Sequence, residues 1–272
     1  MDPDPSDPII CGLDGSENDD AVARIGEHLA VTLGHPLLLL HVAPVQLVGE
    51  RPAATLAERR AEAEAFERAG RLHTVLEPVA ARLASSPASA VEFGEPAEIL
   101  AGAAKQMSAA LLVIGRSSQG MVKRVVLGST TAVLARHAPC PVAIMPSALP
   151  RAGGETIVAG VDGSERSLTV ARVAARLAEG LGLRLVLAAV GPGAESALAA
   201  VADAPGEGIT AEGSPAEALA ALGRSHGAQF LVVGSRGLSP LRAAVLGSTS
   251  RALVQLADRA VVVVPDLQIA VG

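Results

Sequence analysis

An internal repeat constrains the fold of this chain more than any other feature of its sequence. The segment Leu13-Asp14-Gly15-Ser16-Glu17 returns as Val161-Asp162-Gly163-Ser164-Glu165, 148 residues later. The segment Gly94-Glu95-Pro96-Ala97-Glu98 returns as Gly213-Ser214-Pro215-Ala216-Glu217, but only 119 residues later. Two registers held over such stretches indicate two copies of one unit. The second copy is shorter in its middle by the difference between the two offsets, 29 residues.

The boundary between the copies is marked by small residues and prolines. Pro150, Gly153 and Gly154 follow the last aliphatic run of the first copy and precede the first run of the second. We therefore expect one domain at 1–147 (the first copy), a linker at 148–154 and a second domain at 155–272 (the second copy). Because this linker is short, the two copies are expected to pack against each other.

Aliphatic runs alternate with helical patterns in each copy. In the first copy, the runs lie at 8–13, 37–42, 88–93, 111–114 and 142–145. Aromatic residues make up only 1% of the chain, whereas 50% of it is hydrophobic, which suits helices packed on buried parallel strands. The alternation predicts an α/β fold of two tandem, doubly wound, five-stranded parallel-sheet domains of Rossmann-like type. In the second copy, the shortened middle leaves room for at most one short helix.

The overall charge and hydropathy argue against several classes of protein. The net charge is −6 and the isoelectric point about 5.5, without the basic face and stacking aromatics of a nucleic-acid binder. No apolar run reaches the roughly 18 residues of a membrane span, and the acidic N-terminus is unlike a signal peptide. We therefore expect a cytoplasmic protein without a membrane span. Of the two cysteines, Cys11 is expected to be buried in a strand, and Cys140, between two prolines, to be more exposed.

The second copy carries a glycine-rich segment suited to binding phosphate. Gly234-Ser235-Arg236-Gly237 follows an aliphatic run, and Gly247-Ser248-Thr249 comes nine residues later. Glycines let the backbone approach a ligand closely, and successive N–H groups form an anion-binding concavity. Gly247 and Ser248 then open a predicted helix, whose free N–H groups and dipole favour a phosphate.

The first copy has the same segment with one interruption. Gly115 is followed by Ser118 where the second copy has its second glycine, and Gly128, Ser129 and Thr130 complete the pattern. A Cβ at position 118 would crowd a phosphate or demand an unfavourable backbone angle. The second copy is therefore the stronger candidate for a phosphate site.

The other end of each candidate site is expected at the ends of the first two strands of each copy. Ligands on open α/β sheets bind at the carboxyl ends of the strands, near the point where the strand order reverses. Asp14 and Asp162 follow the first strands there, and their carboxylates can accept hydrogen bonds from a ribose or an adenine amine. Val42 and Val190 end the second strands, where backbone groups can pair with a base edge.

These motifs together resemble the universal stress protein family in its tandem form. The family's ATP-binding signature, Gly-x2-Gly-x9-Gly-[Ser/Thr], is matched by Gly234, Gly237, Gly247 and Ser248. The strand-end Asp-Gly-Ser occurs in both copies. The family's Ala-Pro-Cys-Pro-Val ending occurs in the first copy at 138–142 and is replaced in the second.

The resemblance implies an adenine nucleotide alpha hydrolase-like fold and an ATP-binding regulator of the stress response. The aspartates would contact adenosine, the two valines the adenine, and the glycine-rich segments the phosphates, with Mg²⁺ bridging them. It also implies dimer formation through the fifth strands, where Val261–Val264 is an aliphatic run suited to pairing. We expect an intramolecular pseudo-dimer and a homodimer.

Several alternatives compete with this interpretation. The glycine loops could be plain turns, the aspartates helix caps, and arginines such as Arg236 solvated surface charge rather than phosphate ligands. A Walker A loop is disfavoured because Met121 stands where its lysine belongs. No general base or arginine finger is evident, so we expect no enzyme beyond slow ATP hydrolysis. A nucleotide-independent interaction module, a cyclic-nucleotide binder and a phosphotransferase remain as alternatives.

Overall fold

The computed structural model describes residues 4–43, 76–116, 127–146, 154–237 and 246–266. The first copy consists of β1 (Ile9–Leu13), α1 (Asp19–Leu33), β2 (Leu37–Ala43), β3 (Ala88–Phe93), α3 (Pro96–Gln106), β4 (Leu111–Gly115), α4 (Ser129–His137) and β5 (Val142–Met145). The second consists of β6 (Thr156–Gly160), α5 (Glu165–Leu181), β7 (Arg184–Val190), α6 (Ala194–Ala199), β8 (Glu207–Ala211), α7 (Pro215–Ser225), β9 (Ala228–Gly234), α8 (Ser248–Leu256) and β10 (Ala260–Val264).

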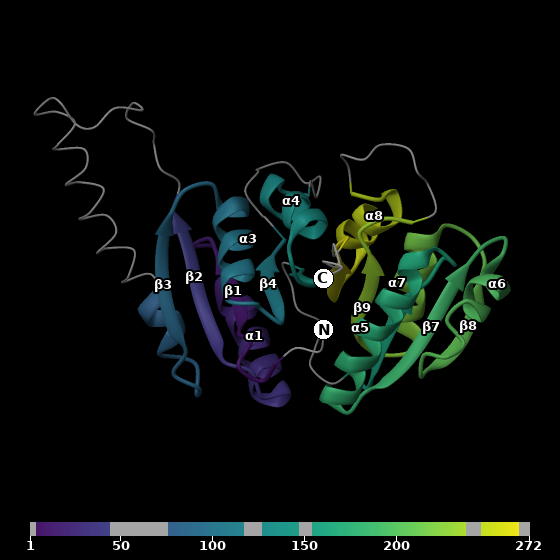
Figure 1. Cartoon of the computed structure of the whole chain (residues 1–272), viewed down its shortest axis with the longest axis horizontal. Coiled ribbons are helices and arrows are strands. Elements are labelled where there is room, and N and C mark those ends of the chain that lie inside the picture. Colours follow the sequence, from purple (N-terminus) through teal and green to yellow (C-terminus); the bar gives the residue numbers. More distant parts are fainter. Residues whose placement is uncertain (1–3, 44–75, 117–126, 147–153, 238–245, 267–272) are drawn as a thin grey trace, which may run out of the picture.

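All ten strands form one continuous sheet (Figure 1). Their order is β3-β2-β1-β4-β5-β10-β9-β6-β7-β8, and the strands of each half are parallel. The halves join where β10 pairs antiparallel with β5, with Val262 opposite Ala143. The predicted fold class is therefore confirmed, and the two parallel five-stranded sheets merge into one mixed sheet.

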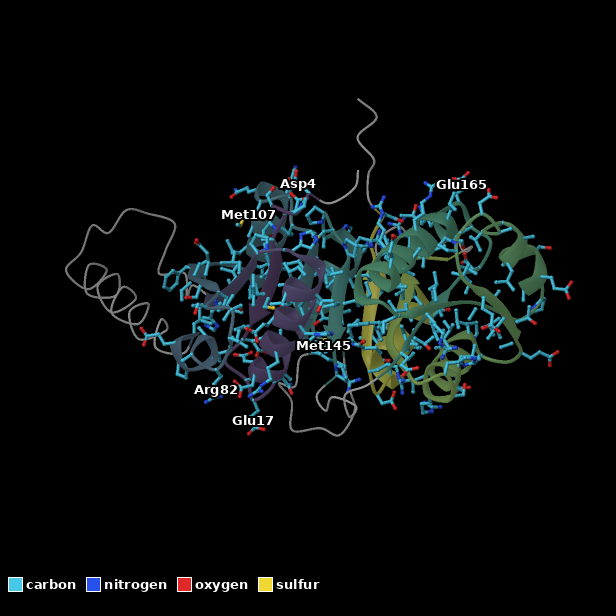
Figure 2. All side chains as sticks on the ribbon, turned by 90° about the horizontal axis from the view of Figure 1, so that it is seen from below. Asp4, Glu17, Arg82, Met107, Met145 and Glu165 are labelled. Atoms are coloured by element: carbon cyan, nitrogen blue, oxygen red, sulfur yellow. The ribbon has the colours of Figure 1, made fainter. Side chains whose placement is uncertain are left out.

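The antiparallel junction, called the seam below, points the carboxyl ends of the two half-sheets in opposite directions. Figure 2 shows Asp4, which precedes β1, at the upper edge of the view and Glu17, which follows β1, at the lower edge. Glu165, which follows β6 in the second copy, lies at the upper edge, as Asp4 does. A site at the carboxyl end of one half-sheet is therefore at the opposite end of the sheet from the equivalent site of the other half.

Two hydrophobic layers hold the helices on the sheet. One contains residues of α1, α5 and α6, together with residues Leu76, Val79 and Leu83. The other contains residues of α3, α4, α7 and α8. Both are built mainly from Ala, Val, Leu and Ile, as the lack of aromatic residues requires, and Phe230 is the largest fully buried side chain.

The helix ends follow the local sequence. Glycines at 34 and 182 end α1 and α5 in the left-handed conformation, which a residue without a Cβ adopts readily. Pro96 and Pro215 begin α3 and α7, where a missing N–H costs nothing. The shortened middle of the second copy holds the single short helix α6, as predicted. The helical composition at 53–85 and the linker at 148–154 lie mostly outside the described residues, although residues 76–80 are helical.

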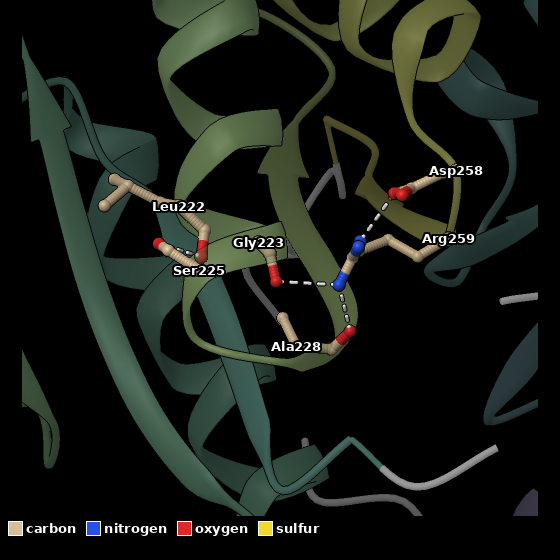
Figure 3. Close-up of polar contacts among 6 residues, drawn as sticks. All are labelled: Leu222, Gly223, Ser225, Ala228, Asp258 and Arg259. Carbon is tan, nitrogen blue, oxygen red and sulfur yellow. Dashed lines mark hydrogen bonds and ion pairs between the residues drawn. The ribbon is translucent and has the colours of Figure 1, made fainter. Parts of the chain in front are cut away.

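The end of the second copy departs from the first at Arg259, which takes the place of Cys140. Arg259 is buried, and its Nη1 donates to the carbonyls of Gly223 (2.7 Å) and Ala228 (2.6 Å), while its Nε pairs with Asp258 (Figure 3). The guanidinium thereby joins α7 to the start of β9.

The expectation that Cys140 is more exposed was wrong. Its side chain is packed in the core, and burial raises the pKa of its thiol to about 12.

The fifth strands of the two copies, β5 and β10, pair with each other within the chain. The predicted intramolecular pseudo-dimer is present, because β5 pairs with β4 and β10, and β10 pairs with β5 and β9. The prediction that two chains pair through their fifth strands was wrong, because both edges of β5 and of β10 are already hydrogen-bonded within the chain. A homodimer through another surface stays a prediction. Within the described residues, no helix is both long and apolar enough to cross a membrane.

Candidate functional site

The strand order brings the predicted site residues of the second copy to one edge of the sheet. The chain passes from β6 outward to β7 and β8, then returns to the other side of β6 with β9, so the order reverses between β6 and β9. Val190 ends β7, Asp162 follows β6 and Gly234 ends β9. These three positions therefore lie at neighbouring strand ends, where ligands bind in open α/β sheets.

Gly237 lies directly against the carboxylate of Asp162. An ideal Cβ on Gly237 would stand 2.5 Å from Asp162 Oδ2, closer than real contacts allow. The carboxylate has little freedom to retreat, because its Oδ1 accepts hydrogen bonds from Ser164 N (3.0 Å) and Ser167 Oγ (2.9 Å). The second glycine of the signature thus contacts the strand-end aspartate, and only glycine fits there without displacing it.

The loop after β9 is closed onto the start of α8. Gly247 N donates to Ser235 O at 2.8 Å, and Ser250 Oγ donates to Gly234 O at 2.5 Å. An ideal Cβ on Gly247 would lie 3.1 Å from Ser235 O, so glycine permits this approach. Ser250 therefore fixes the start of the helix to the end of β9, and its hydroxyl proton is already donated to Gly234 O.

The first turn of α8 supplies donors at this edge. The N-cap residue of α8 is Gly247, which has no side chain to accept a hydrogen bond from the first turn. The first helical bond runs from Arg251 N to Gly247 O, so the N–H groups of Ser248 and Thr249 have no partner within the helix. Ser248 is also exposed. A helix start of this kind favours an anion.

Two side chains of the loop behave differently from each other. Ser235 is fully buried, and its Oγ has no hydrogen-bond partner in the part of the chain that the structure describes. Arg236 forms an ion pair with Asp266, with 3.0 Å between Nη1 and Oδ2, and Asp266 also pairs with Arg166. The positive charge of Arg236 is therefore partly neutralised by Asp266. Arg236 is neither a solvated surface charge nor a residue that interacts with a ligand alone.

The two strand-end aspartates shape turns and are not helix caps. Asp14 Oδ1 accepts from Ser16 N (3.1 Å), just as Asp162 Oδ1 accepts from Ser164 N. The N-cap residues of the following helices are Asn18 and Ser164. The aspartates therefore hold the turns two residues ahead of them, and the helix-cap interpretation was wrong in detail.

The first copy contains a buried carboxylate where the second has a hydroxyl. Asp19 accepts from the backbone N–H groups of Asp14 (3.2 Å) and Gly15 (2.8 Å), and its equivalent Ser167 makes the same two contacts in the second copy. Burial raises the pKa of Asp19 to about 6, and the nearby Asp14 carboxylate adds to the increase. The first copy thus has a titratable carboxyl group at a position where the second has a neutral hydroxyl.

The first copy's loop is also held differently. Arg116, the residue after Gly115, reaches across the seam and donates from Nη1 to the carbonyls of Val254 (3.0 Å) and Gln255 (3.1 Å) in the last turn of α8. Gly128 is the N-cap residue of α4, and Ser129 and Thr130 form its first turn, as predicted. Ser118 lies outside the described residues.

The predicted base-binding residues lie at their expected strand ends. Val42 is the penultimate residue of β2 and is buried, and Val190 is the last residue of β7 and is half-buried. A hollow of about 570 Å³ lies beyond Val190, bordered by Glu195 on α6 and Glu212 after β8. The residues that line this hollow come from the segments 191–196 and 210–212, and none of them belongs to the glycine-rich segment.

Sequence reasoning missed Asp19 and Ser167 in this region, and it considered Arg116 only as a phosphate ligand or as surface charge. The signal for the first two was available in the repeat, since Asp19 and Ser167 occupy equivalent positions and differ in charge. The contact of Arg116 depends on how the two copies meet, which no local pattern specifies. Among the described residues, no group of three or more His, Cys, Asp or Glu side chains is placed to hold a metal ion.

Comparison with known proteins agrees with the repeat and the fold. The model of the universal stress protein family matches residues 5–146 and 196–265. Universal stress proteins of Mycobacterium tuberculosis and Mycobacterium bovis are each 28% identical to this chain over 286 aligned residues, which cover 94% of this chain and 96% of theirs.

Solved structures share the two-copy architecture. A universal stress protein from Archaeoglobus fulgidus DSM 4304 superposes with a TM-score of 0.68 at 19% identity, covering 96% of this chain and 98% of that one. A functionally unknown protein from Pseudomonas aeruginosa PAO1 gives a TM-score of 0.61 at 18% identity, covering 96% and 92%. At these identities, the likeness describes the fold alone.

Proposed function

Because this chain belongs to the universal stress protein family, we propose that it is a regulator that binds ATP through its second copy. The observation that carries the proposal is the contact between Gly237 and Asp162, which joins the phosphate-binding signature to the strand-end aspartate. The loop and the aspartate form one continuous surface at the point where the strand order reverses.

The residues of this surface fit a nucleotide. The N–H groups of Ser248 and Thr249, which have no partner within α8, supply donors for phosphate oxygens, and the α8 dipole adds about 0.3–1 kcal/mol per contact. Asp162 Oδ2 can accept from a ribose hydroxyl or an adenine amine.

Mg²⁺ suits this arrangement without a dedicated protein cage. Magnesium commonly binds through substrate phosphates, waters and only one or two carboxylates. When bound, it would neutralise phosphate charge. Asp162 is a carboxylate beside the glycine loop that could take part, while Arg236 stays paired with Asp266.

In the proposed role, the protein binds ATP and responds to its concentration, and it does not turn ATP over. The donors at this edge are backbone N–H groups and hydroxyls, which hold phosphates but do not activate a water. Multiple-turnover phosphate release from purified protein measures this directly. Release far above the uncatalysed rate would favour the phosphotransferase or ATPase alternative.

Gly237→Ala tests the proposal. The new Cβ meets the restrained Asp162 carboxylate at 2.5 Å, so the loop or the aspartate must shift. We expect ATP·Mg²⁺ affinity, measured by isothermal titration calorimetry, to fall at least tenfold. Gly102→Ala is the matched control, because Gly102 lies in α3 with no atom within 4 Å of its Cβ position. That variant should bind as the unmodified chain does.

The same titrations separate ATP from the other ligands. ADP, cyclic AMP and GTP are titrated alongside ATP, because the loop recognises phosphate while the strand ends select the base. If the unmodified chain binds none of these at millimolar concentration, the nucleotide proposal fails and the interaction-module alternative gains. Tighter binding of cyclic AMP than of ATP would redirect the proposal to that ligand.

A further inference from the structure

We propose that a hollow between the two copies binds a small organic anion, a molecule that joins one carboxylate or phosphate group to an apolar body. The hollow lies between α4 of the first copy and α8 of the second, which are neighbours in Figure 1, and it is called the seam hollow below. None of the described residues that line it belongs to either glycine-rich segment. Such a site is separate from the proposed nucleotide site and does not depend on it.

The seam hollow lies where equivalent parts of the two copies meet. Its volume is about 300 Å³, at the lower end of the range for pockets that hold small ligands. Leu127 and Leu246 both line it, and they are equivalent positions of the two copies, 119 residues apart. Ala132 and Arg251 are a second equivalent pair, and both line it as well. Neither copy alone therefore forms this hollow.

The positive charge of the seam hollow comes from arginines that the other copy lacks. Arg136 and Arg251 line it, and the equivalent residues are Gln255 and Ala132. Among the described residues that line the hollow, none is Asp or Glu, although the chain as a whole has a net charge of −6. A cleft lined by one sign of charge concentrates ligands of the opposite sign, so the hollow favours an anion.

Arg136 is the buried cation of this hollow. It is 5% exposed, and its Nε donates to Nε2 of His137 at 2.9 Å, which is a neutral acceptor. Burial lowers the pKa of its guanidinium, and the positive charge of Arg236 lowers it further, while Asp266 acts in the opposite direction. Asp266 already pairs with Arg166 and with Arg236. An anion in the hollow would stabilise the charge of Arg136, because buried charges need opposite charge or hydrogen bonds.

The rest of the lining is apolar. Leu127, Ala132, Val133 and Leu246 supply it, and Val133 is 44% exposed. An inorganic anion would leave these side chains in contact with water, whereas an apolar body would cover them and gain the free energy of burial. The lining therefore fits a ligand that has both a charged group and an apolar part.

The probe is 8-anilinonaphthalene-1-sulfonate (ANS), which carries one sulfonate on an apolar ring system and fluoresces more strongly when it leaves water. N-phenyl-1-naphthylamine has the same rings without the sulfonate and is the matched neutral probe. Each is titrated into the full chain, with and without excess ATP·Mg²⁺. We expect one saturable ANS site that binds ANS more tightly than the neutral probe and that ATP leaves unchanged.

Two variants on the surface test the charged and the apolar lining. Arg251→Gln removes an exposed charge, so ANS affinity should fall about two- to threefold while binding of the neutral probe stays the same. Val133→Asp places a carboxylate in the hollow, and like-charge repulsion should weaken ANS binding about tenfold.

Arg136→Gln removes the buried charge and should lower ANS affinity about fivefold or more, since bonds from charged donors are the stronger ones. Because Arg136 is buried, circular dichroism checks that this variant folds. If it does not fold, Arg251→Gln and Val133→Asp decide the outcome.

The matched controls make the same charge changes on the other layer of helices. Arg172→Gln removes an exposed arginine from α5, and Val31→Asp adds a carboxylate at a residue of α1 that is 68% exposed. Both helices pack in the hydrophobic layer that contains neither α4 nor α8. Both variants should bind ANS as the unmodified chain does.

Competition then identifies the charged group. Octanoate and octyl phosphate carry the two candidate groups on the same apolar tail, and the one that displaces ANS at the lower concentration has the preferred group. Failure of both to displace ANS would overturn the proposal. So would the absence of a saturable ANS site, equal losses in variants and controls, or displacement of ANS by ATP, which would assign the hollow to the nucleotide site. A chain that binds ANS here but no ATP would contradict only the proposed function.

Discussion

At the residue scale, the two copies differ in the side chain that lies beneath the strand-end turn, a carboxylate in the first and a hydroxyl in the second. Asp19 and Ser167 receive the same two backbone hydrogen bonds, although α1 begins at Asp19 itself and α5 begins at Glu165, two residues before Ser167. Asp19 is 5% exposed and lies near the Asp14 carboxylate. A buried carboxylate at this position disfavours an anionic ligand, whereas a hydroxyl does not.

Asp19 also makes the stability of the chain depend on pH. Its folded pKa of about 6 is above the ordinary value of 3.8, so between these pH values the native state binds more protons than the unfolded state. The free energy of unfolding should therefore fall as pH rises from about 4 to 6, by up to about 1.4 kcal/mol per unit of pKa shift. Asp19→Ser should remove this part of the pH dependence, as measured by urea unfolding at pH 4.5, 5.5, 6.5 and 7.5.

Asp20→Ser is the matched control for this prediction. Asp20 is the neighbouring residue, but it is partly exposed and pairs with Arg82 on the surface. This variant should keep the decline in stability with rising pH. An unchanged slope in Asp19→Ser would contradict the assignment of the effect to the buried carboxylate.

At the element scale, the packing of α1 on β1 illustrates how the repeat conserves volume while changing residues. An ideal Cβ on Gly26 would lie 2.0 Å from Cys11 Sγ, so the helix approaches the strand only because glycine is present. The equivalent pair in the second copy is Ala159 and Ala174, both fully buried. One copy places a thiol against a glycine, and the other places two methyl groups together.

Gly26→Ala should destabilise the chain by about 1–3 kcal/mol, because the added methyl group has no room beside Cys11. Adding Cys11→Ala should restore most of the loss, since the pair then matches Ala159 and Ala174. Denaturant unfolding of the two single variants and the double variant gives the coupling. Additive effects would show that the two side chains do not share this space.

The elements were largely predictable from the sequence, and the reason is local. The strands are short aliphatic runs between turn signals, and β3 (Ala88–Phe93) and β5 (Val142–Met145) have the predicted bounds. The other boundaries moved by one or two residues, because hydrogen bonding to a neighbouring strand extends β9 beyond its aliphatic run to Ala228–Gly234. The partners of the fifth strands were not predictable, since Val261–Val264 could equally pair within or between chains.

At the scale of the whole molecule, the antiparallel seam converts two similar units into an asymmetric pair. It places the end of α8 beside the first copy's loop, and this is why Arg116 has carbonyls to bind. The sequence predicted both glycine-rich segments and ranked the second copy higher on the strength of Ser118. It did not predict the seam contact, because that contact depends on the relative placement of two units whose local patterns are alike.

The central claim is that the unmodified chain binds one adenine nucleotide, and binds it in the second copy. Native mass spectrometry of the purified chain with ATP and Mg²⁺ measures this most directly, because it counts ligands on each intact molecule. We predict a single adduct of one nucleotide per chain that disappears in Gly237→Ala. Two nucleotides per chain, or one that persists in Gly237→Ala, would contradict the account.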